Sequence, residues 1–230
     1  MTIRLKTIFK ILSCLMLLLT SSGLYASHPT IVFNQKGALK DVSSSLQYLE
    51  DKENSYTIGS VQDKEFTLTN NRVLNLGFSN SAYWIKIPIT NNSNFTDLFL
   101  ELSLPILDYI EFYSPTQNDS FTVIKTGQEF PFYLREHQDP NYLFDITIPN
   151  GETRIFYLKI RSTDAIQLPM KIGTREAIYS EIKNRDILSG VYIGIMLVML
   201  FYNLFIYIST KDKNYIYYVV YVLLVLLTQT

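Results

Sequence analysis

One stretch of the sequence combines an aromatic ring with a cation at alternate positions. Residues 83–89 alternate, with isoleucines at 85, 87 and 89 on one parity and Trp84 and Lys86 on the other. This alternation predicts a half-buried strand. If the isoleucines fill the core, Trp84 faces outward and could stack on a sugar or peptide while Lys86 orients a hydroxyl or carboxylate. If both sheet faces are covered, Trp84 is a core residue, and the sequence does not decide between the two.

A later strand carries polar and aromatic side chains of the same kind. Tyr157, Lys159 and Arg161 alternate with apolar residues that we expect to point inward. These side chains extend the surface of Trp84 and Lys86 if the two strands lie in one sheet. All five are therefore candidate ligand-binding residues.

Three further polar residues are candidates for other reasons. Arg135 and His137 belong to a polar segment between predicted strands, and binding residues favour loops on a rigid scaffold. A solvated loop is the alternative interpretation of this segment. Asn203 lies midway along an apolar stretch, where a polar side chain seeks a partner on a neighbouring helix. It could serve packing or belong to a signalling path.

Catalytic motifs are not found in this sequence. It contains no glycine-rich phosphate loop, nucleophile elbow, paired-histidine motif or EF-hand loop. The two histidines are His28 and His137, and the single cysteine is Cys14. We therefore predict no enzyme, no cofactor and no metal centre, although scattered aspartates leave a calcium site open as an alternative. A net charge of −1 without a basic run argues against a nucleic-acid partner.

The scaffold that must position these residues is residues 31–173. This region shows seven or more short alternating segments separated by turn residues, which is typical of an all-β sandwich or barrel. Residues 39–49 carry the one helical pattern in this region. The predicted domain is long enough to bury its own core.

The N-terminus has the layout of a secretory signal peptide. Arg4, Lys6 and Lys10 precede a short apolar run, and small residues follow up to Ala26. We therefore expect residues 1–26 to be a signal peptide that exports the domain. An uncleaved N-terminal anchor helix is the alternative, but the apolar run is short for a membrane span.

The C-terminal part predicts a hairpin of two membrane helices. Residues 188–209 are apolar and uncharged through position 208, which matches the roughly 20 residues needed to cross a bilayer. A short loop with Lys211 and Lys213 leads to a second apolar helix, residues 215–230, which we expect to be incomplete. Residues 174–187 are a predicted linker. The positive-inside bias places the lysine loop in the cytoplasm.

Several motifs together resemble the bacterial seven-transmembrane receptors with diverse intracellular signalling modules, or DISM receptors. Two motifs resemble the start of the family's transmembrane region: the Tyr-Asn-Leu-Phe run inside the first predicted membrane helix, and the charged loop before Tyr-Ile-Tyr-Tyr. Four segments of this chain resemble the type-2 extracellular domain of the family: residues 76–79, 83–86, 104–110 and 155–162. The resemblance implies a jelly-roll fold similar to carbohydrate-binding modules. It also implies seven helices and a cytoplasmic output module, such as a histidine kinase or diguanylate cyclase. Five of those helices and the output module are missing from this chain.

Two functions from different classes follow. In the first, the exported domain of a receptor in the bacterial inner membrane binds a small ligand, either a saccharide or an anionic metabolite, and shifts a helical bundle between two states. In the second, the domain docks another envelope protein or forms a homodimer without a small ligand. An open face carrying Trp84 and Lys86 would favour the first, and a flat exposed apolar patch the second.

Overall fold

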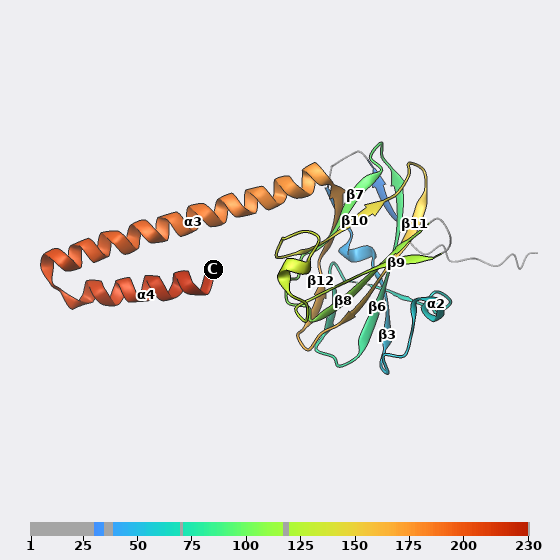
Figure 1. Cartoon of the computed structure of the whole chain (residues 1–230), viewed down its shortest axis with the longest axis horizontal. Coiled ribbons are helices and arrows are strands. Elements are labelled where there is room, and N and C mark those ends of the chain that lie inside the picture. Colours follow the sequence, from blue (N-terminus) through green and yellow to red (C-terminus); the bar gives the residue numbers. More distant parts are fainter. Residues whose placement is uncertain (1–29, 35–38, 70, 117–119, 230) are drawn as a thin grey trace, which may run out of the picture.

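The computed structural model describes residues 30–34, 39–69, 71–116 and 120–229. A β-sandwich occupies one end of the molecule, and two helices project from it as a hairpin (Figure 1). The sandwich confirms the predicted all-β domain. The predicted signal peptide, residues 1–26, lies outside the described residues.

The larger sheet has the strand order β4-β3-β6-β11-β8-β9, and β1 pairs in parallel with β6. Its long central strands are antiparallel, as expected for a sheet with one face on the core. The strands are β1 (Ile31–Asn34), β3 (Gln47–Asp51), β4 (Thr67–Leu68), β6 (Ala82–Asn92), β8 (Tyr109–Pro115), β9 (Phe121–Thr126) and β11 (Thr153–Arg161).

The second sheet has the order β10-β7-β13-β2, and a separate pair is formed by β12 and β5. Both are antiparallel throughout. Their strands are β2 (Leu39–Asp41), β5 (Leu74–Gly77), β7 (Asp97–Leu102), β10 (Tyr142–Thr147), β12 (Ile166–Leu168) and β13 (Met170–Thr174).

The main core lies between these sheets. The isoleucines at 85, 87 and 89 are fully buried in it, as the alternation of β6 predicts. Phe112 stacks on Phe144 of the opposite sheet with ring centroids 4.4 Å apart, and on Phe156 of its own sheet at 5.8 Å. These aromatic contacts join the two sheets and contribute beyond their buried area.

Residues 39–49, predicted as helical, form β2, a turn of 3-10 helix and the start of β3. Long-range pairing overrides the local pattern here. The Val42 amide donates to the Met170 carbonyl at 2.9 Å, and the Ser43 hydroxyl accepts a hydrogen bond from the Met170 amide. A local periodicity cannot indicate such contacts because the partner lies more than a hundred residues away.

The helical hairpin consists of α3 (Arg175–Thr210) and α4 (Lys213–Gln229). Of the described helices, α3 alone is long and apolar enough to cross a membrane, and 6% of its apolar window is buried. Thr174 caps its start by accepting a hydrogen bond from the Ala177 amide. Residues 175–187, expected as part of a linker, are the first turns of this helix.

Those first turns of α3 pack on the outer face of the second sheet. Ile178 is fully buried there against Phe99 and Leu143. Arg175 pairs with Asp145 of β10 at 2.5 Å, and its guanidinium lies over the Phe99 ring. The helix that enters the membrane tract is therefore also part of the sandwich.

Candidate ligand-binding site

The outer face of the larger sheet brings together the predicted strands. In the antiparallel pairing of β6 with β11, Lys86 lies opposite Tyr157 and Trp84 lies opposite Lys159. The next strand, β8, places Glu111 opposite Lys159 and Tyr109 opposite Arg161. Cross-strand neighbours on one face are close enough to interact directly. The two candidate strands thus do share one sheet.

Trp84 is fully buried, which corrects the prediction of an outward ring available for stacking. Its parity is as predicted, but a second small core covers this face: Trp84 packs with Val61, Phe66, Tyr113 and Tyr157. Val61 and Phe66 come from the connection between β3 and β4, which includes α2 (Ile58–Val61). Both faces of the sheet are covered here, which is the alternative that the sequence left open.

The two lysines of the face lie over aromatic rings of this small core. Lys86 Nζ is 5.5 Å from the centre of the Phe66 ring, and Lys159 Nζ is 5.4 Å from that of Trp84. Lys159 also donates a 3.4 Å hydrogen bond to the Tyr56 carbonyl. Tyr157 is 3% exposed. Tyr157 therefore contributes packing, while Lys159 reaches the margin of the covered area.

An open groove begins where this cover ends. It has a volume of about 220 Å³, and we call it the Lys159–Arg161 groove; its lining residues are Asn54, Tyr109, Glu111, Lys159 and Arg161. Two cations, a carboxylate, an amide and a phenol therefore converge on one hollow. This donor and acceptor set suits a ligand with hydroxyl or carboxylate groups.

Glu111 is the charged centre of a hydrogen-bond network in the groove. It accepts from the hydroxyls of Tyr109 at 2.7 Å and Tyr113 at 2.6 Å, and pairs with Lys125 at 2.9 Å. Burial alone favours the neutral acid, but these donors together lower the pKa of Glu111. Burial and the Glu111 carboxylate raise the pKa of Tyr113. Glu111 is thus held as a carboxylate and Tyr113 as a phenol.

Arg161 joins the groove to the connection between β9 and β10. Its guanidinium lies over the Tyr109 ring at 5.3 Å and pairs with Glu129 at 3.0 Å. Gly127 makes the turn into this connection with a φ of +132°, and a Cβ there would come 2.1 Å from the Asp108 carbonyl oxygen. Only glycine fits so close to the neighbouring backbone.

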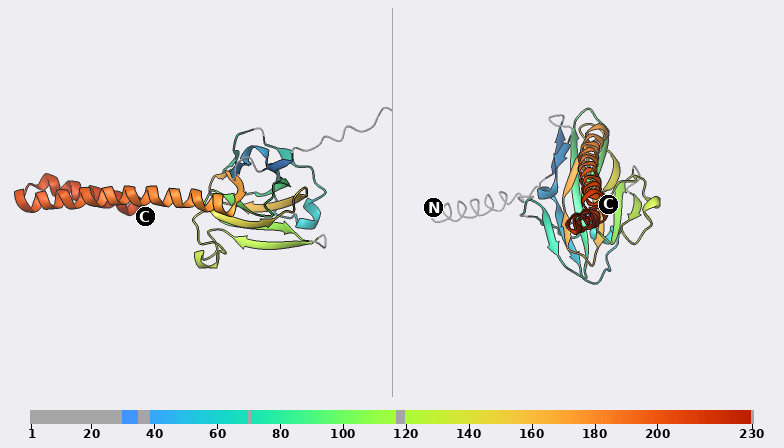
Figure 2. Two further views of the ribbon diagram at one scale, coloured as in Figure 1. Left: turned by 90° about the horizontal axis from the view of Figure 1, so that it is seen from above. Right: turned by 90° about the vertical axis from the view of Figure 1, so that its left-hand side faces the viewer.

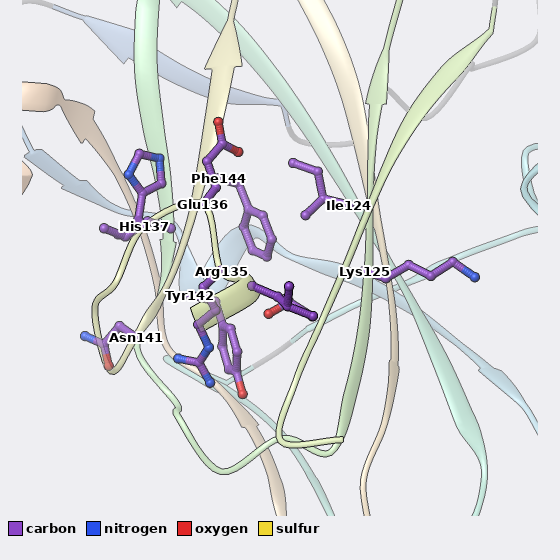
Figure 3. Close-up of a pocket in the computed structure, with 11 residues that line it drawn as sticks. Ile124, Lys125, Arg135, Glu136, His137, Asn141, Tyr142 and Phe144 are labelled. Atoms are coloured by element: carbon purple, nitrogen blue, oxygen red, sulfur yellow. The ribbon is translucent and has the colours of Figure 1, made fainter. Parts of the chain in front are cut away.

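Arg135 and His137 lie elsewhere, in residues 131–141, which we call the 131–141 loop. A small pocket of about 80 Å³ separates this loop from β9 and β10. Arg135 lies alongside Tyr142, 4.4 Å from its ring centre (Figure 3). It also donates to the Asp139 and Pro140 carbonyls. Its hydrogen bonds therefore hold the shape of the loop, and the pocket is too small for a sugar.

His137 faces the base of α3 rather than the groove. Its Nε2 lies 2.7 Å from Asp145, which also binds Arg175. Glu136, His137 and Asp145 offer ligand atoms within 4.8 Å of one another, a spacing that a metal ion would require. Arg175 already pairs with Asp145 at 2.5 Å, so this carboxylate has two protein partners, Arg175 and His137, without an ion.

Asn203 donates a 2.8 Å hydrogen bond to the Met199 carbonyl of its own helix. The predicted partner was a neighbouring helix. Within the described residues, α3 packs on α4 through Leu200 and Val222, next to this position. This bond gives one N–H of the Asn203 side chain a partner within its own helix.

Tyr109, Glu111 and Asn54 line the groove but were not predicted from the sequence. Tyr109 and Glu111 alternate with buried Ile110 and Phe112 in β8, so the parity rule that indicated Lys159 and Arg161 could also have indicated them. Asn54 carries no such signal because it lies in the turn after β3, with a φ of 51°.

A β-sandwich that continues without a break into an apolar helix has the architecture of a membrane receptor's extracellular domain. The family model described as 7TMR-DISM extracellular 2 matches residues 43–174, and the model described as 7TM diverse intracellular signalling matches residues 185–230. The chain belongs to the 7TMR-DISM receptor family. It is therefore a membrane protein with an extracellular N-terminal sensor domain, and these family domains are not catalytic.

A search of curated proteins finds no relative. Among solved structures, one titled "Structural basis for the promiscuous specificity of the carbohydrate-binding modules from the beta-sandwich super family" is similar at 9% identity. The match covers 59% of this chain and 54% of that chain, with a TM-score of 0.24. The chain spans about half of that protein's length, and a likeness of this extent carries no argument about a ligand.

Proposed function

We propose that this chain is the sensor portion of a bacterial signalling receptor whose Lys159–Arg161 groove binds a small anionic saccharide or a related carboxylate. The observation that supports it is the convergence of Lys159 and Arg161 with Tyr109 and Glu111 in a hollow of about 220 Å³. The receptor class follows from the family membership. The ligand chemistry is inferred from the side chains that line the groove.

Each groove residue has a part in this recognition. The guanidinium of Arg161 can bind a carboxylate with two parallel hydrogen bonds, since Glu129 competes for it only in an exposed pair. Glu111 can accept a hydrogen bond from a sugar hydroxyl, and Tyr109 offers an aromatic ring. A charged sugar can contact the two cations and the Glu111 carboxylate at once, whereas a fully apolar ligand would remove these groups from water without offering them a hydrogen bond.

In this proposal the receptor lies in the bacterial inner membrane with its sandwich in the periplasm. A signal peptide in residues 1–26 exports residues 31–173. Residues 188–209 and 215–230 then cross the bilayer, and the loop with Lys211 and Lys213 lies in the cytoplasm. Ligand binding alters the sandwich, and α3 passes the change to a helical bundle and its output module.

The test is binding of glucuronate and of glucose to the 230-residue chain in lipid nanodiscs, measured by saturation-transfer NMR and titration calorimetry. We expect saturable binding of glucuronate and at least tenfold weaker binding of glucose, because one lost charge-assisted contact is worth about 1.5–3 kcal/mol. Arg161→Ala should abolish the preference for glucuronate.

Arg154→Ala is the matched control. Arg154 lies on the same strand as Arg161 but outside the groove, where it pairs with Glu152. This variant should bind glucuronate as the wild type does. Equal loss of binding in both arginine variants, or no binding of either sugar by the wild type, would contradict the proposed ligand class.

A further inference from the structure

The 131–141 loop exposes three consecutive large apolar side chains. They belong to the short 3-10 helix η2 (Phe132–Leu134), where Phe132 is 48% exposed, Tyr133 is 73% exposed and Leu134 is 63% exposed. Single exposed apolar residues are ordinary, but a contiguous group on a projecting loop marks an interaction surface. The Lys159–Arg161 groove does not include these residues.

The loop that carries η2 is firmly built. Arg135 donates to two backbone carbonyls of the loop, and its guanidinium lies 4.9 Å from the Phe132 ring centre. The Asp139 carboxylate accepts from the Asn141 amide at 2.8 Å and pairs with Arg185 of α3 at 2.8 Å. The three apolar side chains are therefore presented by a fixed scaffold.

The pair with Arg185 fixes the height of the loop along α3. Arg185 is the first residue matched by the membrane-region family model. The uncharged span starts at Ile187, only about 3 Å further along the axis at 1.5 Å per residue. The Asp139 end of the 131–141 loop therefore lies beside the start of the apolar span of α3.

The views of the whole chain agree with this placement. In Figure 1 and in the left view of Figure 2, the short yellow-green helix η2 lies on the side of the sandwich that faces the membrane tract. The helix α2, by contrast, lies on the side away from α3 and α4. The short helix η2 is thus on the side of the domain from which α3 and α4 project.

We propose that η2 inserts Phe132, Tyr133 and Leu134 into the outer interface of the lipid bilayer. Aromatic side chains favour this layer because their rings lie among the acyl chains while their polar edges remain hydrated, and leucine adds apolar area. Arg135 beside them keeps a cation at the level of the lipid phosphates. The sandwich then contacts the membrane at two points, α3 and η2, which restricts its rotation about the helix.

The experiment places a nitroxide spin label on the full 230-residue chain in nanodiscs of phosphatidylcholine and phosphatidylglycerol. Cys14→Ser removes the single cysteine, and Tyr133→Cys then carries the label. The matched control is Gln62→Cys, an exposed position at the end of α2. Collision rates with oxygen and with a water-soluble nickel chelate report how deep each label lies. Unchanged unfolding midpoints show that both variants keep the fold.

We expect the ratio of oxygen to nickel collisions to be several-fold higher at position 133 than at position 62. Equal ratios at the two positions would overturn the proposal. Protection of position 133 from both reagents would show a protein cover, such as another part of the helical bundle, and would also overturn it. Dipolar broadening that disappears on dilution with unlabelled chain would identify a second copy as the occupant instead.

Discussion

The two outer faces of the sandwich are both covered, but by segments of very different kinds. On the larger sheet, Trp84 and Tyr157 are buried by the nearby connection that contains α2. On the second sheet, Phe99 and Leu143 are buried by Ile178 of α3, the helix that continues toward the membrane. One cover belongs to the domain alone, and the other joins the domain to the membrane helices.

This difference indicates where a signal can leave the domain. A change on the larger sheet must pass through the sandwich or through the connection from Glu129 to Asp139 to reach α3. A change on the second sheet meets α3 directly. Substitutions in the two covers should therefore differ in what they disturb.

The largest expected effect is that of Trp84→Ala. Removing a fully buried tryptophan leaves a cavity and should lower the free energy of unfolding by about 3–5 kcal/mol. Urea-dependent pulse proteolysis of the full chain in detergent micelles measures this. Phe78→Ala, at a ring that is 79% exposed, is the control and should change little. A wild-type midpoint for Trp84→Ala would mean that the cover over this face is not formed.

Ile178→Ala should have a smaller effect on stability but a distinct local one. Loss of this fully buried side chain should cost about 2–5 kcal/mol, concentrated where α3 leaves the sheet. Hydrogen exchange of the amides in residues 175–182 should then speed up, while the core of β6 stays protected. Ile187→Ala, on the same helix but 53% exposed, should leave both regions as they are. If Ile178→Ala instead raised the amide exchange rates equally throughout the domain, the two covers would not differ in what they disturb.

Glu111→Gln tests the charge network of the groove, with an expected loss of about 1–3 kcal/mol at neutral pH. The folded pKa of Glu111 lies below its ordinary value of 4.5, so the carboxylate stabilises the fold fully above that pH. The difference in free energy of unfolding between the wild type and Glu111→Gln should therefore disappear as the pH falls through the lowered pKa of folded Glu111. Unfolding midpoints from pH 7 to pH 3 measure it. Glu152→Gln, with a side chain that is 55% exposed, should show no such dependence, and a constant difference across the range for Glu111→Gln would contradict the argument.

The smallest effect is expected from Asp139→Asn, which breaks the pair with Arg185. The Asp139 side chain is 9% exposed and that of Arg185 39%, so the loss should be about 1 kcal/mol. Its signature is local: the 131–141 loop should become more sensitive to protease. Asp186→Asn, at an exposed neighbour of Arg185, is the control. Equal protease sensitivity in both variants would show that the pair does not hold the loop.

The sandwich was predictable because alternation reports which residues share a face. The isoleucines of β6 and the parity of Lys159 and Arg161 follow from this rule. The rule does not report what lies above a face, and for that reason Trp84 could not be assigned to the surface or to a core. Nor does it report long-range pairing, which converted residues 39–49 from a predicted helix into strands. The groove needs both kinds of information, since Asn54 and Glu111 meet only in the folded sheet.

The unbroken helix α3 has a mechanical consequence. Its 36 residues include no proline and form one continuous helix from the turns packed on the sheet into the membrane tract. At 1.5 Å per residue such a helix is about 54 Å long, so a tilt of about 5° at its base moves the far end by roughly 5 Å. Along a straight helix of this length, a small repacking of Ile178 on the second sheet would become a displacement at the far end on the scale of a helical turn.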